Sequence, residues 1–117
     1  MKDRFKFRHW DKRINKMFYP ERNDNFGYYV NNSDIIETMQ CTGLKDKNSK
    51  LIYEGDIVKI FHVSGTMQGK YFFDVVEWND LRCRFDTENY GIINDDDVYE
   101  VIGNIYENPE LLKEKDQ

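Results

Sequence analysis

The chain has 117 residues, of which 39% are hydrophobic, and acidic side chains outnumber basic ones by 22 to 17. This length is typical of one domain with one core, and the eight Tyr, eight Phe and two Trp predict an aromatic-rich core. No apolar run approaches the roughly 18 residues that a membrane helix needs, and the basic start lacks the apolar stretch of a signal peptide. We therefore expect a soluble, cytoplasmic protein that forms a single domain over residues 1–117 and does not bind a membrane.

The first predicted element is a β-hairpin. Residues 4–8 alternate strictly between basic and aromatic side chains, as a half-buried strand requires. Phe5 and Phe7 are expected to be buried on one face. The opposite, exposed face is expected to carry Arg4, Lys6 and Arg8. A turn then leads to a returning strand over residues 16–19, which ends at Pro20 because proline cannot donate a ladder hydrogen bond.

The rest of the chain is expected to contain further strands, because turn residues recur between short apolar stretches. Ser33 or Asp34 can cap a short helical turn after the hairpin. The expected strands that follow are 37–42, 51–53, 57–61, 71–78, 81–85 and 99–106. Asn108 and Pro109 suit the cap and the first position of a C-terminal helix. The sequence thus predicts a small, mainly β domain, built as a barrel or sandwich, with a short C-terminal helix.

The residue types that carry catalysis or bind metals do not form a recognisable set. The acidic run Asp95–Asp97 lacks the spacing of a calcium loop, so we predict a solvated loop and no metal site. Cys41 and Cys83 are far apart, belong to no CxxC motif and are expected to be free thiols. His9 and His62 cannot be combined with either cysteine and an orienting group, and no Gly-rich phosphate motif occurs. We predict neither catalytic residues nor a cofactor.

The charge is distributed unevenly along the chain. Residues 1–22 carry eight basic and three acidic side chains, whereas residues 86–117 carry two basic and ten acidic ones. The candidate binding surface consists of Arg4, Lys6, Arg8 and Trp10. Alternate basic residues of a strand are about 7 Å apart, close to the spacing of phosphates, so single-stranded nucleic acid is one expected ligand. The alternatives are that the basic residues only keep an edge strand soluble or that they pair with the acidic third of the chain.

Two longer segments indicate a family. Residues 42–58 and 100–112, together with the opening stretches Phe5–Trp10 and Met17–Tyr19, resemble the YopX-like proteins of bacteriophages and prophages. The resemblance implies a mainly β fold with a complex strand order and no recognised catalytic residues. The chain has Ser49 where this family usually has glycine, and glycine would suit a backbone position with positive φ.

These observations predict a non-enzymatic accessory protein of a phage or prophage that acts as an interaction module or assembles as a homo-oligomer. Its partner is not identified by the sequence. The alternative is a nucleic-acid-binding accessory protein that uses the basic N-terminal hairpin. The pI near 5.0 argues against this alternative, since nucleic-acid-binding domains are usually basic.

Overall fold

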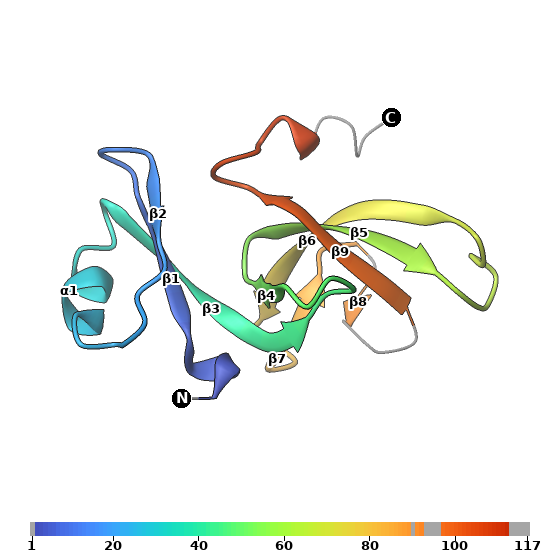
Figure 1. The fold of residues 1–117 in the computed structure, drawn as a ribbon, viewed down its shortest axis with the longest axis horizontal. Coiled ribbons are helices and arrows are strands. Elements are labelled where there is room, and N and C mark those ends of the chain that lie inside the picture. The colour runs from blue at the N-terminus through green and yellow to red at the C-terminus, as the bar shows by residue number, and fades with distance from the viewer. Residues whose placement is uncertain (1, 90, 93–96, 113–117) are drawn as a thin grey trace.

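The computed structural model describes residues 2–89, 91–92 and 97–112 (Figure 1). Most of the regular structure is strand, which confirms the mainly β class. The elements, in chain order, are the 3₁₀ helix η1 (Asp3–Phe5), β1 (Phe7–Asp11), β2 (Lys16–Phe18), α1 (Phe26–Asn31), β3 (Ile36–Lys45), β4 (Leu51–Tyr53), β5 (Asp56–His62), β6 (Tyr71–Asn79), β7 (Arg84–Thr87), β8 (Gly91–Ile92) and β9 (Asp97–Asn104).

The strands form two antiparallel sheets. The first sheet has the order β2-β1-β3-β4, and the second has the order β8-β7-β6-β5-β9. The second sheet is curled, and it lies to the right of the β1–β2 hairpin and α1 in Figure 1. Because β1 pairs with β3 and β5 pairs with β9, the order is not sequential along the chain, which confirms the complex strand order.

The largest hydrophobic cluster fills the inner face of the second sheet. Its buried members are Ile52, Val58, Ile60, Val76 and Tyr99, with Phe85 and Val101 packed around them. Ile52 belongs to β4 of the first sheet, so this strand covers the inner face of the second. The outward face of β5 carries Lys59 and Phe61, which alternate with the buried Val58 and Ile60 as the pleat requires.

Strand β1 is buried on both faces. On one face the Phe7 ring lies 4.7 Å from the Phe26 ring of α1, and His9 stacks on Tyr29 at 3.8 Å between ring centroids. The other face carries Arg8 and Trp10, which are 2% and 8% exposed and point toward the second sheet. The sequence-based prediction of a half-buried edge strand was therefore wrong.

Other boundaries also differ from the predictions. Arg4 and Phe5 belong to η1, so β1 begins only at Phe7, and Phe5 is 45% exposed rather than buried. The expected helical turn after Ser33 does not form there, because the chain enters β3 at Ile36. The α-helix α1 precedes it at residues 26–31.

The turn between β3 and β4 joins the two sheets. One carboxylate oxygen of Asp46 accepts the N–H groups of Asn48 and Lys50, and the other accepts the Val101 N–H at 2.9 Å. The Lys47 N–H donates to the Tyr99 carbonyl at 2.9 Å, so this turn covers the edge of β9. The two segments that carry the family resemblance therefore contact each other.

Ser49 occupies the position with positive φ in this turn, at φ +65°. The expected conformation of that position is confirmed, although the chain has serine instead of glycine. A serine there is strained by its Cβ, and the turn is stable because Asp46 bonds the backbone on both sides of it.

The chain after β9 turns back over the second sheet. Leu111 and Leu112 are helical, which agrees with a helix that begins near Pro109, and residues 113–117 lie outside the described residues. Of the acidic run Asp95–Asp97, residues 95 and 96 also lie outside them. No helix in the described ranges is long and apolar enough to cross a membrane.

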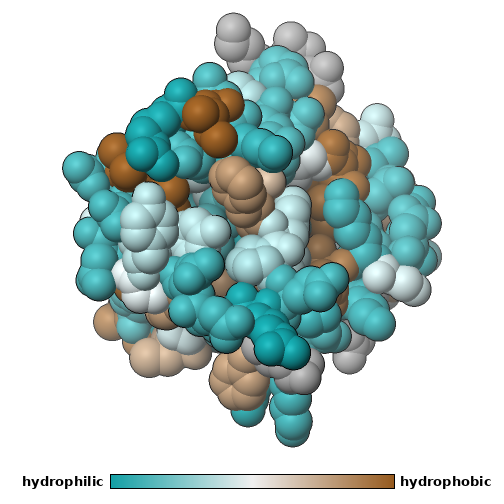
Figure 2. All heavy atoms as spheres, turned by 60° about the vertical axis from the view of Figure 1, so that its left-hand side comes forward, coloured by the Kyte–Doolittle hydropathy of each residue, from teal (hydrophilic) through white to brown (hydrophobic). Residues whose placement is uncertain are grey.

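Figure 2 shows the face on which α1 and the β1–β2 hairpin lie. Hydrophilic residues dominate this face, and the hydrophobic ones form separate patches. On the second sheet, an exposed apolar row crosses three neighbouring strands, since Phe61 pairs with Tyr71 on one side and with Val98 on the other.

Candidate binding surfaces

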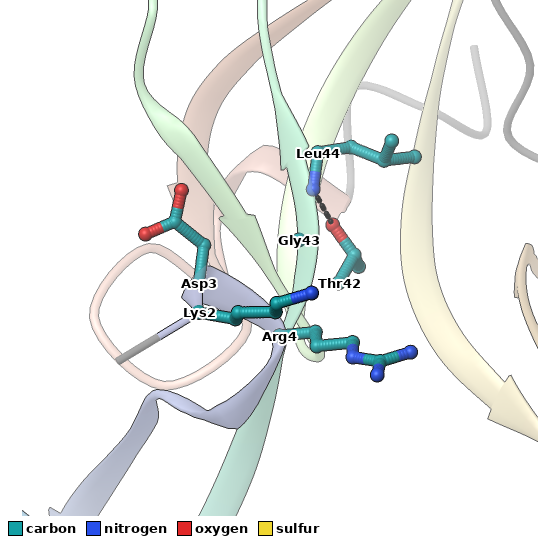
Figure 3. Close-up of a pocket in the computed structure, with 6 residues that line it drawn as sticks. All are labelled: Lys2, Asp3, Arg4, Thr42, Gly43 and Leu44. Atoms are coloured by element: carbon teal, nitrogen blue, oxygen red, sulfur yellow. Dashed lines mark hydrogen bonds between the residues drawn. The ribbon is translucent and has the colours of Figure 1, made fainter.

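The N-terminal segment retains part of the predicted basic surface. Lys2 and Arg4 are exposed and border a shallow hollow of about 490 Å³ against residues 42–44 of β3 (Figure 3). The Arg4 guanidinium lies 4.8 Å from the centre of the Phe5 ring. Lys6 is half-buried, and its ammonium group pairs with Asp3 at 3.1 Å. This surface thus presents two cations and an exposed aromatic ring.

Backbone geometry sets the approach of η1 to β3. Gly43 has φ +84°, and a Cβ placed on it would lie 3.2 Å from the Cβ of Arg4. A side chain at this position would be strained and would push against η1. Gly43 therefore fixes how closely the N-terminal cations lie against β3.

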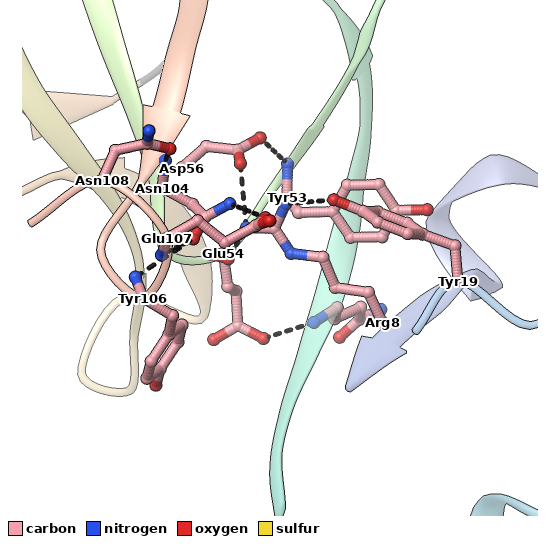
Figure 4. A network of polar contacts seen from close by, with 10 residues as sticks. Arg8, Tyr19, Tyr53, Glu54, Asp56, Asn104, Tyr106, Glu107 and Asn108 are labelled. Atoms are coloured by element: carbon pink, nitrogen blue, oxygen red, sulfur yellow. Dashed lines mark hydrogen bonds and ion pairs between the residues drawn. The ribbon is translucent and has the colours of Figure 1, made fainter. Parts of the chain in front are cut away.

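Arg8 does not belong to this surface, which corrects the prediction. Its guanidinium lies 2.8 Å from the Asp56 carboxylate, donates to the Glu54 carbonyl at 2.9 Å, and stacks 4.8 Å from the Tyr53 ring (Figure 4). These contacts join β1 to the turn between β4 and β5. Arg8 is part of the packing between the sheets.

Burial of the Arg8–Asp56 pair costs free energy, because both charged groups lose their contact with water. Burial raises the pKa of Asp56, and the positive charge of Arg8 and the N–H of Tyr53 oppose this effect. Burial also raises the pKa of Tyr53 to about 12. The position of the pair on the inside of the molecule gives it a structural role and leaves it unable to meet a ligand.

The second correction to the predicted surface concerns Trp10. This residue lies on the side of β1 that faces the segment after β9. Its indole stacks on Tyr106 with ring centroids 5.6 Å apart. The two rings line a cavity of about 590 Å³ between the β1–β2 hairpin and this segment. The other lining residues are Asn15, Glu107, Pro109 and Glu110. We refer to this cavity as the aromatic cleft.

Asn104 builds one wall of the aromatic cleft. Its buried side-chain oxygen accepts the N–H groups of Tyr106 and Glu107, and its amide donates to the Glu107 carboxylate at 2.8 Å. This Asn-centred turn holds Tyr106 and Glu107 in fixed directions. Glu107 and Glu110 are nevertheless exposed at the rim of the cleft.

The rim of the cleft is negatively charged, because the carboxylates of Glu107 and Glu110 are exposed there. Burial raises the pKa of Tyr106, the negative charge of Glu37 raises it further, and the charges of Arg8 and Glu54 act in opposite directions. The cleft therefore has the properties of a site for a positively charged group.

From the sequence, Tyr106 and Trp10 could line an aromatic pocket, but the core was the preferred interpretation, because aromatic residues of a small β domain more often fill its core. Glu107 was not a candidate, since it fell beyond the end of the expected last strand. That strand ends at Asn104 instead. A signal was present, since asparagine often accepts backbone N–H groups two or three residues ahead and so turns the chain. The aromatic partner, Trp10, is distant in sequence and gave no local signal.

The nucleophilic and metal-ligating residues are placed as structural groups. Cys41 is buried and burial raises its thiol pKa, whereas Cys83 is exposed, and both are free thiols as predicted. His9 shares a hydrogen bond of 2.9 Å with the Thr38 hydroxyl, and burial lowers its pKa. In the part of the chain that the structure describes, no group of three or more His, Cys, Asp or Glu residues could hold a metal ion.

The fold defines a small, mainly β protein with two packed sheets, and its charged surfaces are candidates for binding. The family model for "YopX protein" matches residues 20–113, and the chain belongs to this family. Among solved structures, it is similar to the crystal structure of protein EF1440 from Enterococcus faecalis, at 28% identity and a TM-score of 0.64 over 92% of this chain and 96% of that one. No curated protein matches the chain.

Proposed function

We propose that this member of the YopX family is a non-enzymatic accessory protein of a phage or prophage that assembles with further copies of itself. The observation that carries the proposal is the separation of opposite charges. In Figure 1, η1 lies at the bottom of the molecule, and the chain after β9 lies at the top. Lys2 and Arg4 therefore cannot pair with Glu107 and Glu110 of the same molecule.

Separated charges of this kind suit contacts between molecules. A basic end that meets the acidic side of the next copy makes a head-to-tail interface, and such interfaces close into rings when the rotation permits. Exposed cations and carboxylates attract over roughly one screening length, about 8 Å at physiological ionic strength. The proposed assembly should therefore respond to salt.

The non-enzymatic part of the proposal is supported by the state of the reactive groups. Cys41 is buried with a raised pKa, which disfavours the nucleophilic thiolate. His9 is held between Thr38 and Tyr29 in the core of the first sheet. Neither is arranged as a nucleophile with a base and an orienting group.

The alternative function is nucleic-acid binding through the N-terminal surface. It now depends on Lys2, Arg4 and the exposed Phe5 ring, because Arg8 and Trp10 are buried. Phosphate pairing and ring stacking are the contacts by which single strands are bound. The net charge of −5 opposes this function, and we rank it second.

The experiment that tests the proposal measures mass in solution by light scattering, at low and high salt. The variant Lys2→Glu/Arg4→Glu reverses the basic surface, and Glu107→Lys/Glu110→Lys reverses the acidic one. Each variant alone should lose assembly, and an equal mixture should recover it, because the reversed surfaces are complementary to each other. The control Lys45→Glu/Lys70→Glu changes the same amount of charge on exposed residues elsewhere and should assemble like the parent.

A parent protein that is monomeric at every salt concentration would refute self-assembly. An oligomer that resists salt would instead place the interface on the exposed row of Phe61, Tyr71 and Val98. Salt-sensitive binding of a single-stranded oligonucleotide that disappears in Lys2→Glu/Arg4→Glu would support the alternative function.

A further inference from the structure

The aromatic cleft combines flat rings with carboxylates, and this combination suits one kind of side chain. We infer that the cleft is a recognition site for an arginine guanidinium, and that its occupant is Arg4 of a second copy of the chain. This inference rests on the proposed self-assembly and names the contact that would mediate it.

The aromatic wall supplies the stacking surface. Trp10 is 8% exposed and stacks on Tyr106 at 5.6 Å, so it supports the half-buried Tyr106 ring, which supplies the accessible part of the wall. The planar, weakly hydrated guanidinium of arginine stacks on aromatic rings better than the compact ammonium of lysine does. The rings therefore favour arginine over lysine.

The carboxylates supply the charge. Glu107 is positioned by the Asn104 amide at 2.8 Å, so its side chain loses little further freedom when a cation binds. Glu110, the residue that follows Pro109, lies at the same rim. A guanidinium forms paired, charge-assisted hydrogen bonds with a carboxylate, and these are stronger than neutral ones.

The charge balance of the cleft is one-sided. Among the described residues that line it, two are carboxylates and none is Lys, Arg or His. A cationic occupant is complementary to this site, whereas an anionic one would be repelled.

Arg4 is the complementary group on the surface of the same chain. It is exposed on η1 near Lys2, and its guanidinium lies 4.8 Å from the centre of the exposed Phe5 ring. Three other arginines are paired within the molecule: Arg8 with Asp56, Arg13 with Asp11 and Arg84 with Asp86. Arg22 and Arg82 are exposed as well, but Arg4 is distinguished by the second cation, Lys2, beside it and by the exposed Phe5 ring.

The first test uses Trp10 as the reporter. The variant Trp78→Phe removes the second tryptophan, which lies on β6 outside the cleft. The probe is an acetylated peptide with the sequence Lys-Asp-Arg-Phe-Lys-Phe of residues 2–7. Its addition should change the Trp10 emission in a saturable way, and the same peptide with lysine in place of arginine should bind at least about tenfold more weakly.

The matched variants locate the site. Glu107→Gln/Glu110→Gln in the Trp78→Phe background should weaken the peptide at least about tenfold, since it removes both charges while keeping shape. Glu77→Gln, on an exposed residue of β6, should leave binding unchanged. Equal binding of the two peptides, or binding that the loss of both carboxylates does not weaken, would overturn the arginine site.

The second test asks whether Arg4 is the natural occupant. The association constant from light scattering should fall at least about tenfold in Arg4→Ala and in Glu107→Gln/Glu110→Gln, and the combined variant should be little worse than either, because all remove one contact. An assembly that Arg4→Ala leaves intact would overturn Arg4 as the occupant, even if the peptide binds.

The two proposals can fail separately. If the protein assembles but the peptide does not bind and the cleft variants assemble normally, the arginine site is wrong and self-assembly stands. If the protein is monomeric at every salt concentration, self-assembly is wrong, and Arg4 of a second copy is excluded as the occupant. The peptide titration alone then decides whether the cleft recognises arginine.

Discussion

The guanidinium of Arg8 lies 2.8 Å from the carboxylate of Asp56, and the two side chains are 3% and 2% exposed. Arg8 comes from β1 of the first sheet and Asp56 from the start of β5 in the second. The pair is therefore a buried ionic link between the two sheets, supported by the hydrogen bonds from Arg8 to the Glu54 carbonyl and from the Tyr53 N–H to Asp56.

The first prediction follows from this link. Arg8→Met should lower the free energy of unfolding by about 3–5 kcal/mol, because it leaves the Asp56 charge buried without its partner. Urea unfolding followed by tryptophan fluorescence measures the change. Arg8→Met/Asp56→Asn should recover much of the loss, since the charge is then absent and the amide oxygen can still accept the Tyr53 N–H. A single variant as stable as the parent would show that the pair does not hold the sheets together.

The second prediction compares two glycines. A Cβ on Gly103 would lie 2.6 Å from the side-chain oxygen of Asn108, whereas a Cβ on Gly27 of α1 has nothing within 4 Å. Gly103→Ala should displace Asn108, break its bond to the Asn104 N–H and destabilise the protein. Gly27→Ala should stabilise it by roughly 0.5–1 kcal/mol, because alanine loses less entropy in a helix. Thermal unfolding that moves in the same direction for both variants would contradict this reading.

The parts of the fold that could be predicted from sequence are those with one exposed face and clear turns. The strand 51–53 was predicted with its observed bounds, and β5 and β6 lie within one residue of their predicted ends. From Val58 onward β5 alternates between buried and more exposed residues, and glycines or polar turns separate these strands. Alternation is informative wherever one face of a sheet meets water.

The first strand shows why the same rule failed elsewhere. Its basic and aromatic residues alternate, but α1 covers one face and the second sheet covers the other, so alternation does not separate buried from exposed positions. The partner of Arg8 is Asp56, which is distant in the sequence, and no local pattern predicts this pairing. Of the four residues of the predicted binding surface, Arg4 and Lys6 therefore remain on it. Arg8 and Trp10 are buried instead.

The third prediction concerns the two phenylalanines near the start. Phe5 is 45% exposed, whereas Phe7 is half-buried against the Phe26 ring at 4.7 Å. Phe7→Ala should therefore cost roughly 2–3 kcal/mol, somewhat less than a fully buried ring, and Phe5→Ala less than about 1 kcal/mol. Urea midpoints measured for both variants test the difference. Equal losses would mean that Phe5 is buried in solution, as the sequence had suggested.

The fourth prediction concerns the thiols. Cys83 is exposed, whereas Cys41 is fully buried with a pKa raised by burial. A maleimide reagent should therefore label one thiol of the native protein quickly and the second only after denaturant is added. Cys83→Ser should abolish the fast phase, and Cys41→Ser should leave it unchanged. Fast labelling of the Cys83→Ser variant would show that the first sheet opens around Cys41.

The last prediction concerns Asp46, which joins the β3–β4 turn to β9. Burial on its own raises the pKa of this carboxyl, but the N–H groups of Val101, Lys50 and Asn48 outweigh it, so the pKa is lowered from its ordinary value of 3.8. A lowered pKa in the folded state means that the ionised carboxylate stabilises the fold above this value, and that the contribution is lost as the pH falls through the folded pKa.

Asp46→Asn should therefore be less stable than the parent near neutral pH, because the amide has only one oxygen and leaves the buried Val101 N–H without an acceptor, at a cost of roughly 1–3 kcal/mol. The difference between parent and variant should shrink as the pH falls below the ordinary value of 3.8 and through the lowered pKa of the folded state, where the parent carboxylate becomes protonated. Urea unfolding at a series of pH values measures this difference. Asp34→Asn, on an exposed residue, should change stability little at any pH. A difference that stays constant over the whole acid range would show that Asp46 acts through the shape of its turn, and that its charge contributes nothing.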